Sequence, residues 1–237
     1  MGMPIKITTV TPVETHIVDD VFEYFRAVDA RYSTYKPTSE ISRINAGLPP
    51  DKWSDEMQEI MRLCELTAKQ THGYFNIIRP DGQLDPSGLV KGWAIQRAAE
   101  LFKSKGVKNF SIDAGGDIQV CGNGPSDAEW RIGIRNPFDR TEVIKVVSVR
   151  NKGVATSGTA IRGQHIYDPQ GGKDLTNIVS LTIIGPDIYD ADRFATAAFA
   201  MGQKGISFIE ALKGFEGYMI DKNGIATMTS AFEEYVR

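Results

Sequence analysis

Asp192 and Thr196 are the residues whose types and spacing suggest chemistry most directly. They lie in the segment Asp192-Arg193-Phe194-Ala195-Thr196, at the start of an alanine-rich stretch. On a helix, residues four positions apart share one face, so this carboxylate and this hydroxyl can converge on one ion. Two hard oxygens with positions left for phosphate and water suit Mg²⁺. A structural interpretation stays open, in which Asp192 favours the helix N-terminus and Thr196 bonds back to the preceding turn.

A second segment has the composition of a phosphate-binding helix start. It is Asp85-Pro86-Ser87-Gly88-Leu89-Val90-Lys91-Gly92, which runs from a turn into an expected helix. Free backbone amides at a helix N-terminus, with a lysine beside them, bind phosphate oxygens well. The alternative is an ordinary helix start followed by a surface lysine.

Two further segments combine glycines with polar residues. Asp113-Ala114-Gly115-Gly116-Asp117 connects two expected strands, and its paired glycines permit either close approach to a ligand or a simple hairpin turn. Ala155-Thr156-Ser157-Gly158 precedes Arg162 and His165-Ile166-Tyr167-Asp168-Pro169. Because His165 shares its loop with an arginine and an aspartate, both a catalytic and a structural role are open for it.

The elements that must position these residues mix helices and strands without strict alternation. This order favours an α+β fold, with mainly antiparallel sheets and packed helices, over a doubly wound sheet. The polar stretch 32–45 reads as a shaped loop. Hydrophobic periodicity and turn residues predict helices over 19–30, 54–71, 90–104, 191–201 and 206–212. They predict strands over 5–9, 110–113, 118–121, 130–135, 143–150, 154–157, 179–184, 217–221 and 225–228.

Composition narrows the classes of protein to consider. A chain of 237 residues forms one large domain or two intimately packed lobes, and we expect a single domain over 1–237. The net charge of −3 argues against nucleic-acid binding, which needs a basic face. No stretch is apolar enough to span a bilayer, and residues 1–10 lack the pattern of a secretion signal. We therefore expect a cytoplasmic protein, although an export signal removed from the sequence would leave the same pattern.

The cysteine content also limits the chemistry of a metal site. Cys64 and Cys121 are the only two cysteines, and we expect both to be buried free thiols. Zinc is thus disfavoured, and any metal should be a hard ion with oxygen ligands.

Taken in order, these motifs resemble the FAD:protein FMN transferase family, once described as thiamine-biosynthesis lipoproteins. The resemblance runs nearly from end to end. The sequence departs from the family pattern at Asn76, where the family often has Asp, and at Ser87-Gly88-Leu89-Val90, where it commonly has Gly-Gly-Ile-Ala. The matching motifs are Met1-Gly2-Met3-Pro4-Ile5, the serine- and tyrosine-containing stretch 33–45, Gly73-Tyr74-Phe75, Leu84-Asp85, Val90-Lys91-Gly92, Gly115-Gly116-Asp117-Ile118, 130–137, Thr156-Ser157-Gly158, His165-Ile166-x-Asp168-Pro169 and Ala191-Asp192-x-x-Ala195-Thr196-Ala197.

The resemblance implies a role for each motif. Asp192 and Thr196 become side-chain ligands of Mg²⁺, with a backbone carbonyl, that of Val90, completing the set. His165 lies beside the reacting phosphates and is the preferred base, with Asp192 as the other candidate. The residues implied to contact FAD are Met3, Ser39, Glu40, Asn45, Lys91, Gly115, Gly116, Asp117, Thr156, Ser157, Gly158 and His165.

The reaction implied is Mg²⁺-dependent transfer of FMN from FAD to a threonine or serine of an acceptor flavoprotein, with release of AMP. Two other functions use the same motifs. One is a Mg²⁺-dependent FAD pyrophosphatase, in which water replaces the acceptor hydroxyl. The other is a flavin-binding module without catalysis. The sequence identifies neither the acceptor protein nor the oligomeric state.

Overall fold

The computed structural model describes residues 2–139, 141–159, 171 and 177–237. Its centre is a seven-stranded sheet with the order β1-β2-β3-β6-β7-β8-β9, in which every neighbouring pair is antiparallel. A two-stranded antiparallel sheet, β4-β5, is separate from it. The strands are β1 (Ile5–Thr9), β2 (Phe110–Ala114), β3 (Asp117–Cys121), β4 (Trp130–Arg135), β5 (Val143–Val149), β6 (Gly153–Gly158), β7 (Ile178–Gly185), β8 (Glu216–Asp221) and β9 (Ala226–Met228).

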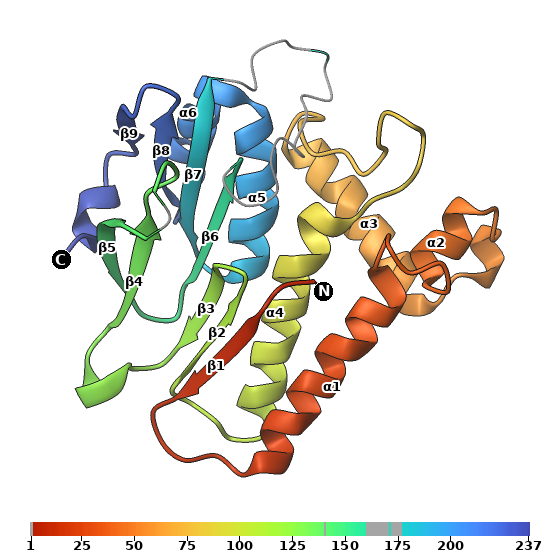
Figure 1. Cartoon of the computed structure of the whole chain (residues 1–237), viewed down its shortest axis with the longest axis horizontal. Coiled ribbons are helices and arrows are strands. Elements are labelled where there is room, and N and C mark those ends of the chain that lie inside the picture. The colour runs from red at the N-terminus through yellow and green to blue at the C-terminus, as the bar shows by residue number, and fades with distance from the viewer. Residues whose placement is uncertain (1, 140, 160–170, 172–176) are drawn as a thin grey trace.

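Helices cover one face of the large sheet, and the β4-β5 hairpin lies on the other side (Figure 1). The α-helices are α1 (Thr15–Tyr32), α2 (Glu40–Asn45), α3 (Asp55–Gln70), α4 (Ser87–Ser104), α5 (Ile188–Ala200) and α6 (Gly205–Glu210). Short 3-10 turns occupy Pro50–Lys52, Pro125–Asp127, Gly202–Lys204 and Phe232–Tyr235. Within the described ranges, no helix has the length and apolar character needed to cross a membrane.

Two hydrophobic cores follow from this layering. The main core lies between helices and sheet; in β2 the alternating residues Phe110, Ile112 and Ala114 are buried there, as a strand with one covered face requires. The second core lies on the opposite face of the sheet, where Trp130 of β4 and Phe232 pack with strands β3, β6, β7 and β8. The sheet is thus covered on both faces near its middle, which is where the candidate site residues of β3 and β6 lie.

The α+β prediction with mainly antiparallel sheets is confirmed. Each predicted helix and strand is present, with ends shifted by a few residues; α1 begins at Thr15 and α4 at Ser87, earlier than expected. The prediction of a loop over the whole of 32–45 is wrong, because residues 40–45 form α2. Cys64 and Cys121 are buried free thiols, as expected.

The missed helix α2 has a local cause that the sequence contains. The Ser39 hydroxyl accepts a hydrogen bond from the Ser42 amide at 3.1 Å, which satisfies one of the free amides of the first turn. Ile41 and Ile44, three residues apart, bury the same face of this short helix. Because most residues of the segment are polar, this cap and this apolar pair were not recognised as a helix from the sequence.

Candidate active site

Two glycines allow α4 and α5 to approach closely, and this contact forms the floor of the site. A Cβ atom at Gly92 would lie 2.6 Å from the Asp192 Cβ and 2.7 Å from the Ile188 carbonyl oxygen. A Cβ atom at Gly88 would lie 3.0 Å from the Thr196 Cγ2. Gly88 and Gly92 are four residues apart, so they present one face of α4 to α5. The lack of side chains on that face brings the backbone of α4 against Asp192 and Thr196.

Asp192 is the fifth residue of α5 and is almost fully buried, with 2% of its surface exposed. Its Oδ2 accepts a hydrogen bond from the Gly92 amide at 2.7 Å, and its Oδ1 lies 3.3 Å from the Lys91 Nζ. The N-terminal cap of α5 is Asp187, whose side chain accepts from the Asp190 amide. The capping role considered for Asp192 therefore belongs to Asp187, and Asp192 has partners outside its own helix.

Burial raises the pKa of Asp192 to about 7, because desolvation penalises the charged form. The neighbouring Lys91 lowers this pKa and the nearby Asp117 carboxylate raises it. An added cation beside this buried carboxylate would stabilise its charged form further. Carboxylates with strongly perturbed pKa values cluster at functional sites.

Lys91 joins the helix layer to the sheet. Its Nζ forms ion pairs with both Asp192 of α5 and Asp117, the first residue of β3. Asp117 is buried, and its Oδ1 accepts a hydrogen bond from the Thr156 amide of β6 at 3.0 Å. The Thr156 hydroxyl in turn lies 2.9 Å from the Thr182 hydroxyl of β7. Segments that lie far apart in the sequence thus meet around one lysine.

Thr196 lies one turn after Asp192, and its hydroxyl donates to the Gly88 carbonyl at 3.3 Å. The carbonyl that meets the Asp192 and Thr196 face is therefore that of Gly88, whereas the family resemblance had indicated Val90. Two residues correspond to about 200° around a helix, so Gly88 faces α5 and Val90 turns to the opposite side of α4. The contact favours Gly88 in the ligand set; the assignment of Val90 stays a prediction without a contact that supports it.

The glycine turn between β2 and β3 lies beside the N-terminal segment. A Cβ at Gly115 would lie 3.0 Å from the Met3 Sδ, and the Gly115 amide donates to the Pro4 carbonyl at 3.1 Å. Both Gly115 and Gly116 have positive φ angles and are exposed, and the Gly116 amide donates to Asp113. Met3 and the exposed glycine turn, all predicted FAD contacts, are brought together next to Asp117.

Residues 39–45 have well-defined structural partners. Both oxygens of the buried Glu40 accept from Ser54, one from its amide at 2.6 Å and one from its hydroxyl at 2.7 Å. The Asn45 side chain accepts from the Leu84 amide at 2.8 Å and donates to the Leu84 carbonyl at 3.0 Å. Asn45 thus fixes the approach to α4. Contact of Ser39, Glu40 or Asn45 with FAD stays a prediction.

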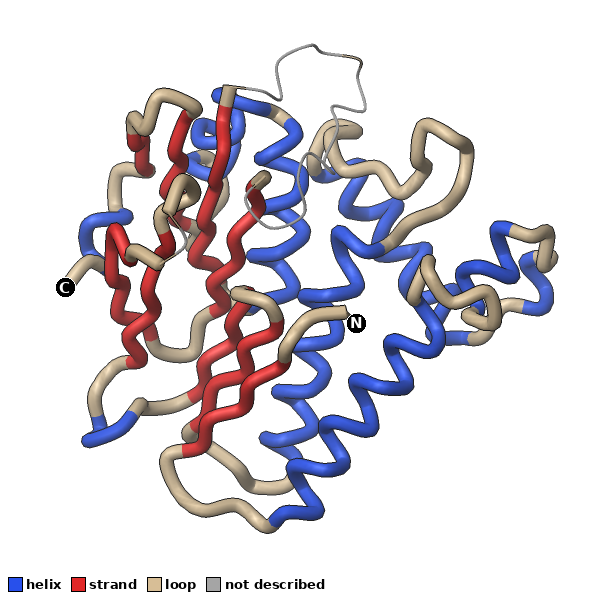
Figure 2. Tube along the Cα trace, viewed as in Figure 1, coloured by secondary structure: helices blue, strands red, loops and turns tan. Residues whose placement is uncertain are grey.

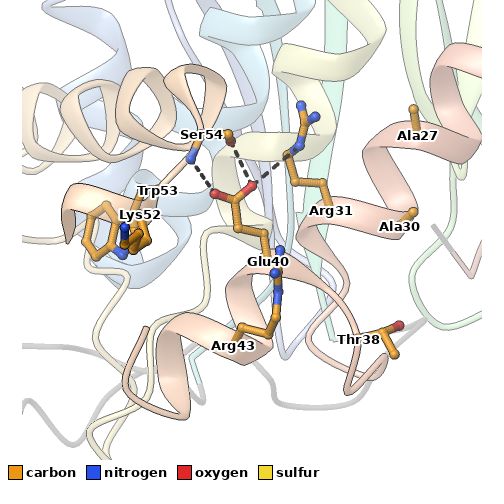
Figure 3. A pocket seen from close by; sticks show the side chains of 9 residues that line it. All are labelled: Ala27, Ala30, Arg31, Thr38, Glu40, Arg43, Lys52, Trp53 and Ser54. Atoms are coloured by element: carbon orange, nitrogen blue, oxygen red, sulfur yellow. Dashed lines mark hydrogen bonds and ion pairs between the residues drawn. The ribbon is translucent and has the colours of Figure 1, made fainter. Parts of the chain in front are cut away.

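A cavity of about 540 Å³ lies beside Glu40 (Figure 3), and Arg31, Arg43, Lys52 and Trp53 contribute to its lining. Figure 3 shows Glu40 between Ser54 and Arg31, the latter with its Nε 3.5 Å from the carboxylate. This cavity does not include Lys91, Asp117 or Asp192 in its lining. We place the candidate site at the lysine and its two carboxylates, because buried interacting charges are there.

The remaining predicted residues fall at the end of β6. Ser157 is buried and Gly158 ends the strand, where a Cβ would lie 2.7 Å from the Val179 carbonyl oxygen. His165, Arg162 and Asp168 lie outside the described residues, so the predicted role of His165 stays a prediction. Among the residues that are described, no group of three or more His, Cys, Asp or Glu side chains could hold a metal ion.

Sequence reasoning missed two members of this arrangement. The Gly88 carbonyl could have been found, because Gly88 and Gly92 are spaced to face one neighbouring helix. Thr182 could not, because nothing in the apolar strand 178–185 marks its hydroxyl as the partner of Thr156.

Comparison with known proteins identifies the family of this chain. The model of the ApbE family matches residues 1–80 and 77–219, which together are most of the chain. The chain belongs to the ApbE family. Among solved structures, this ApbE-family protein is similar to the flavin transferase ApbE from Vibrio cholerae, with a TM-score of 0.86 and 22% identity over 99% of this chain and 96% of that one. At that identity the likeness shows the fold.

The chain is also similar to curated proteins named FAD:protein FMN transferase. The FAD:protein FMN transferase of Escherichia coli (strain K12) is 29% identical to the ApbE-family chain over 189 residues, covering 75% of this chain and 54% of that protein. The FAD:protein FMN transferase of Vibrio cholerae serotype O1 is 31% identical over 143 residues, which cover 56% of this chain and 43% of that protein. The chain therefore spans about half the length of these two curated relatives.

Proposed function

We propose that this chain transfers the FMN part of FAD to a threonine or serine hydroxyl of an acceptor protein and releases AMP. Membership of the ApbE family and the names of the relatives support flavin transfer as the reaction. The observation that supports it most within the chain is Lys91, held between the buried carboxylates of Asp117 and Asp192. The Thr196 hydroxyl lies on the adjacent face of α5, and a lysine charge together with a hydroxyl suits a pyrophosphate.

The same residues fit Mg²⁺, which we propose as the cofactor. The Asp192 carboxylate, the Thr196 hydroxyl and the Gly88 carbonyl are hard oxygen donors on the facing sides of α4 and α5. Hard oxygen donors, with positions left for phosphate and water, are what Mg²⁺ prefers. When bound, Mg²⁺ would neutralise charge on the pyrophosphate and stabilise the departing AMP. The glycines at 88 and 92 bring the α4 backbone against Asp192 and Thr196, so that the Gly88 carbonyl oxygen lies 3.3 Å from the Thr196 hydroxyl.

The chain's own residues supply positioning and charge. Lys91 places a positive charge against the pyrophosphate, and Asp117 holds that lysine from the sheet side. The acceptor oxygen attacks the phosphorus on the riboflavin side, a phosphoester bond forms, and the bond from that phosphorus to the AMP oxygen breaks. The hydroxyl proton goes to a base. We propose His165 for this role, because both oxygens of the alternative, Asp192, already interact with Gly92 and Lys91.

The test is AMP release from FAD and FMN attachment to candidate acceptor domains, each measured with and without Mg²⁺. Thr196→Val removes the proposed ligand hydroxyl at nearly constant volume, and Thr196→Ser keeps it as the matched control. We expect Mg²⁺-dependent attachment that falls at least tenfold in the valine variant and stays near native in the serine variant. AMP release without attachment to any acceptor would support a pyrophosphatase. Attachment that is equal with and without Mg²⁺ would overturn the metal assignment.

A further inference from the structure

Strand β1 forms one edge of the seven-stranded sheet, and its outer side has no strand partner among the described residues. Figures 1 and 2 show it at the border of the sheet. Lys6 is exposed and the other four residues of the strand are partly exposed. An edge strand of this kind can pair with an extended segment from another chain.

The register with β2 identifies which backbone groups face outward. The Gly115 amide donates to the Pro4 carbonyl, and the Val10 amide donates to the Asn109 carbonyl. Residues 4 and 10 are therefore hydrogen-bonded to β2, and by the antiparallel alternation so are residues 6 and 8. The N–H and C=O groups of Ile5, Ile7 and Thr9 consequently point away from β2, toward the open edge.

The N-terminal end of this edge lies next to the candidate site. Met3 packs on Gly115, and Gly115-Gly116 connects β2 to Asp117, the residue that holds Lys91. A segment that paired along β1 and continued past its N-terminal end would reach the side of the site formed by this turn. An added strand would lie three strand spacings, about 14 Å, from Asp117, so about four or five further residues, turning across the ends of β1 and β2, would bring its hydroxyl to the lysine.

We propose that β1 is the docking strand for the acceptor protein, which adds an extended segment to this edge and so brings its threonine or serine to the site. This inference rests on the proposed function. Three observations favour an acceptor segment as the occupant. The outward groups are backbone donors and acceptors at alternate residues, they match an extended chain of any sequence, and the edge ends beside Met3 and the Gly115-Gly116 turn, which the family resemblance implies in FAD binding.

Proline substitution tests the pairing with little disturbance of the sheet. Ile7→Pro and Thr9→Pro each remove one outward N–H and leave the β1–β2 hydrogen bonds in place. The matched controls, Ile7→Ala and Thr9→Ala, alter the same side chains but keep the N–H. The probe is an acceptor domain that the native chain labels with FMN, as detected by mass. We expect the proline variants to raise the KM for the acceptor about tenfold or more, with native FAD affinity and an unfolding temperature close to that of the matched alanine variant. The alanine variants should leave that KM within about twofold of native.

Residue-resolved amide hydrogen exchange tests the docking strand independently of the kinetics. On addition of the acceptor domain, the Ile7 and Thr9 amides should become protected, whereas those of Lys6 and Thr8, already bonded to β2, should change little. Unchanged exchange at Ile7 and Thr9, or proline variants with native KM, would overturn the docking inference while native labelling still supports the transferase. Protection that appears with protein concentration alone would instead indicate a second copy on this edge, and would also overturn it. If the native chain labels no acceptor, the proposed function itself fails.

Discussion

The close approach of α4 and α5 makes a specific prediction for Gly92→Ala. Inside a helix, alanine is more favourable than glycine by about 1 kcal/mol, so propensity alone predicts a more stable protein. The added Cβ would, however, lie 2.6 Å from the Asp192 Cβ and 2.7 Å from the Ile188 carbonyl oxygen. Carbon atoms in contact need about 3.5–4.0 Å, so the helices must separate by about 1 Å.

The magnitude follows from these opposing terms. Overpacking of a well-packed core costs about 1–3 kcal/mol, of which helix propensity offsets up to about 1 kcal/mol. A net loss of about 1–2 kcal/mol corresponds to a fall in unfolding temperature of roughly 2–8 °C for a chain of this size. Because the same displacement moves Asp192 away from the Gly92 amide, flavin transfer should fall about 100-fold.

Thermal unfolding by circular dichroism and FMN attachment to an acceptor measure the two effects. Gly88→Ala is the graded control: its Cβ would meet a side-chain methyl of Thr196 at 3.0 Å, which can move, so its loss of stability should be smaller. A Gly92→Ala variant that unfolds at or above the native temperature and transfers flavin at the native rate would refute the reasoning.

Three further predictions concern other parts of the structure. Asn45→Ala should lower the free energy of unfolding by about 1–2 kcal/mol, because the Leu84 amide and carbonyl lose their hydrogen-bond partner. Urea unfolding measures this loss, and a native midpoint in the variant would contradict the prediction. Lys91→Met should weaken FAD binding at least tenfold in a flavin titration, because the two buried carboxylates of Asp117 and Asp192 lose their counterion. Lys91→Arg keeps the charge and should retain most of the affinity. Native affinity in the methionine variant would disprove a role of Lys91 in FAD binding. Burial raises the pKa of Cys64 to about 12, so the unfolded chain loses the thiol proton at lower pH than the folded chain does. The contribution of the neutral thiol to the free energy of unfolding is therefore fully present below about pH 8.5 and is lost as the pH rises toward 12. The free energy of unfolding of the native chain should therefore fall more steeply between about pH 8.5 and about pH 10 than that of Cys64→Ala, by up to about 1.4 kcal/mol per pH unit, and equal slopes would count against the assignment.

The strands and long helices could be predicted because each has a local signal. Phe110, Ile112 and Ala114 alternate in β2, and α3 has a serine cap with apolar residues at helical spacing. The short helix α2 was missed because its one turn of apolar residues is embedded in a polar segment. The order of the strands depends on long-range pairing, such as β3 with β6, for which single strands contain no signal.

In the candidate site, too, local features could be predicted from the sequence and long-range contacts could not. The spacing of Asp192 and Thr196 predicts that they share a helix face, and the glycines near Lys91 mark a close approach. That Lys91 joins Asp192 to Asp117 follows only from the packing of α4 between α5 and the sheet. The carbonyl that accepts from Thr196, that of Gly88, illustrates the limit most clearly, because it depends on the rotation of α4 about its axis.

The measurement that tests the central proposal most directly is the mass of an acceptor domain after incubation with FAD, Mg²⁺ and the chain, with native protein and Asp192→Asn side by side. Asparagine keeps the size of the side chain and removes its charge. We predict a mass gain of one FMN on a threonine or serine, equimolar AMP, and at least a 100-fold loss of both in the variant. Equal labelling by the folded variant, or no labelling of any acceptor by a native chain that binds FAD, would contradict the proposal.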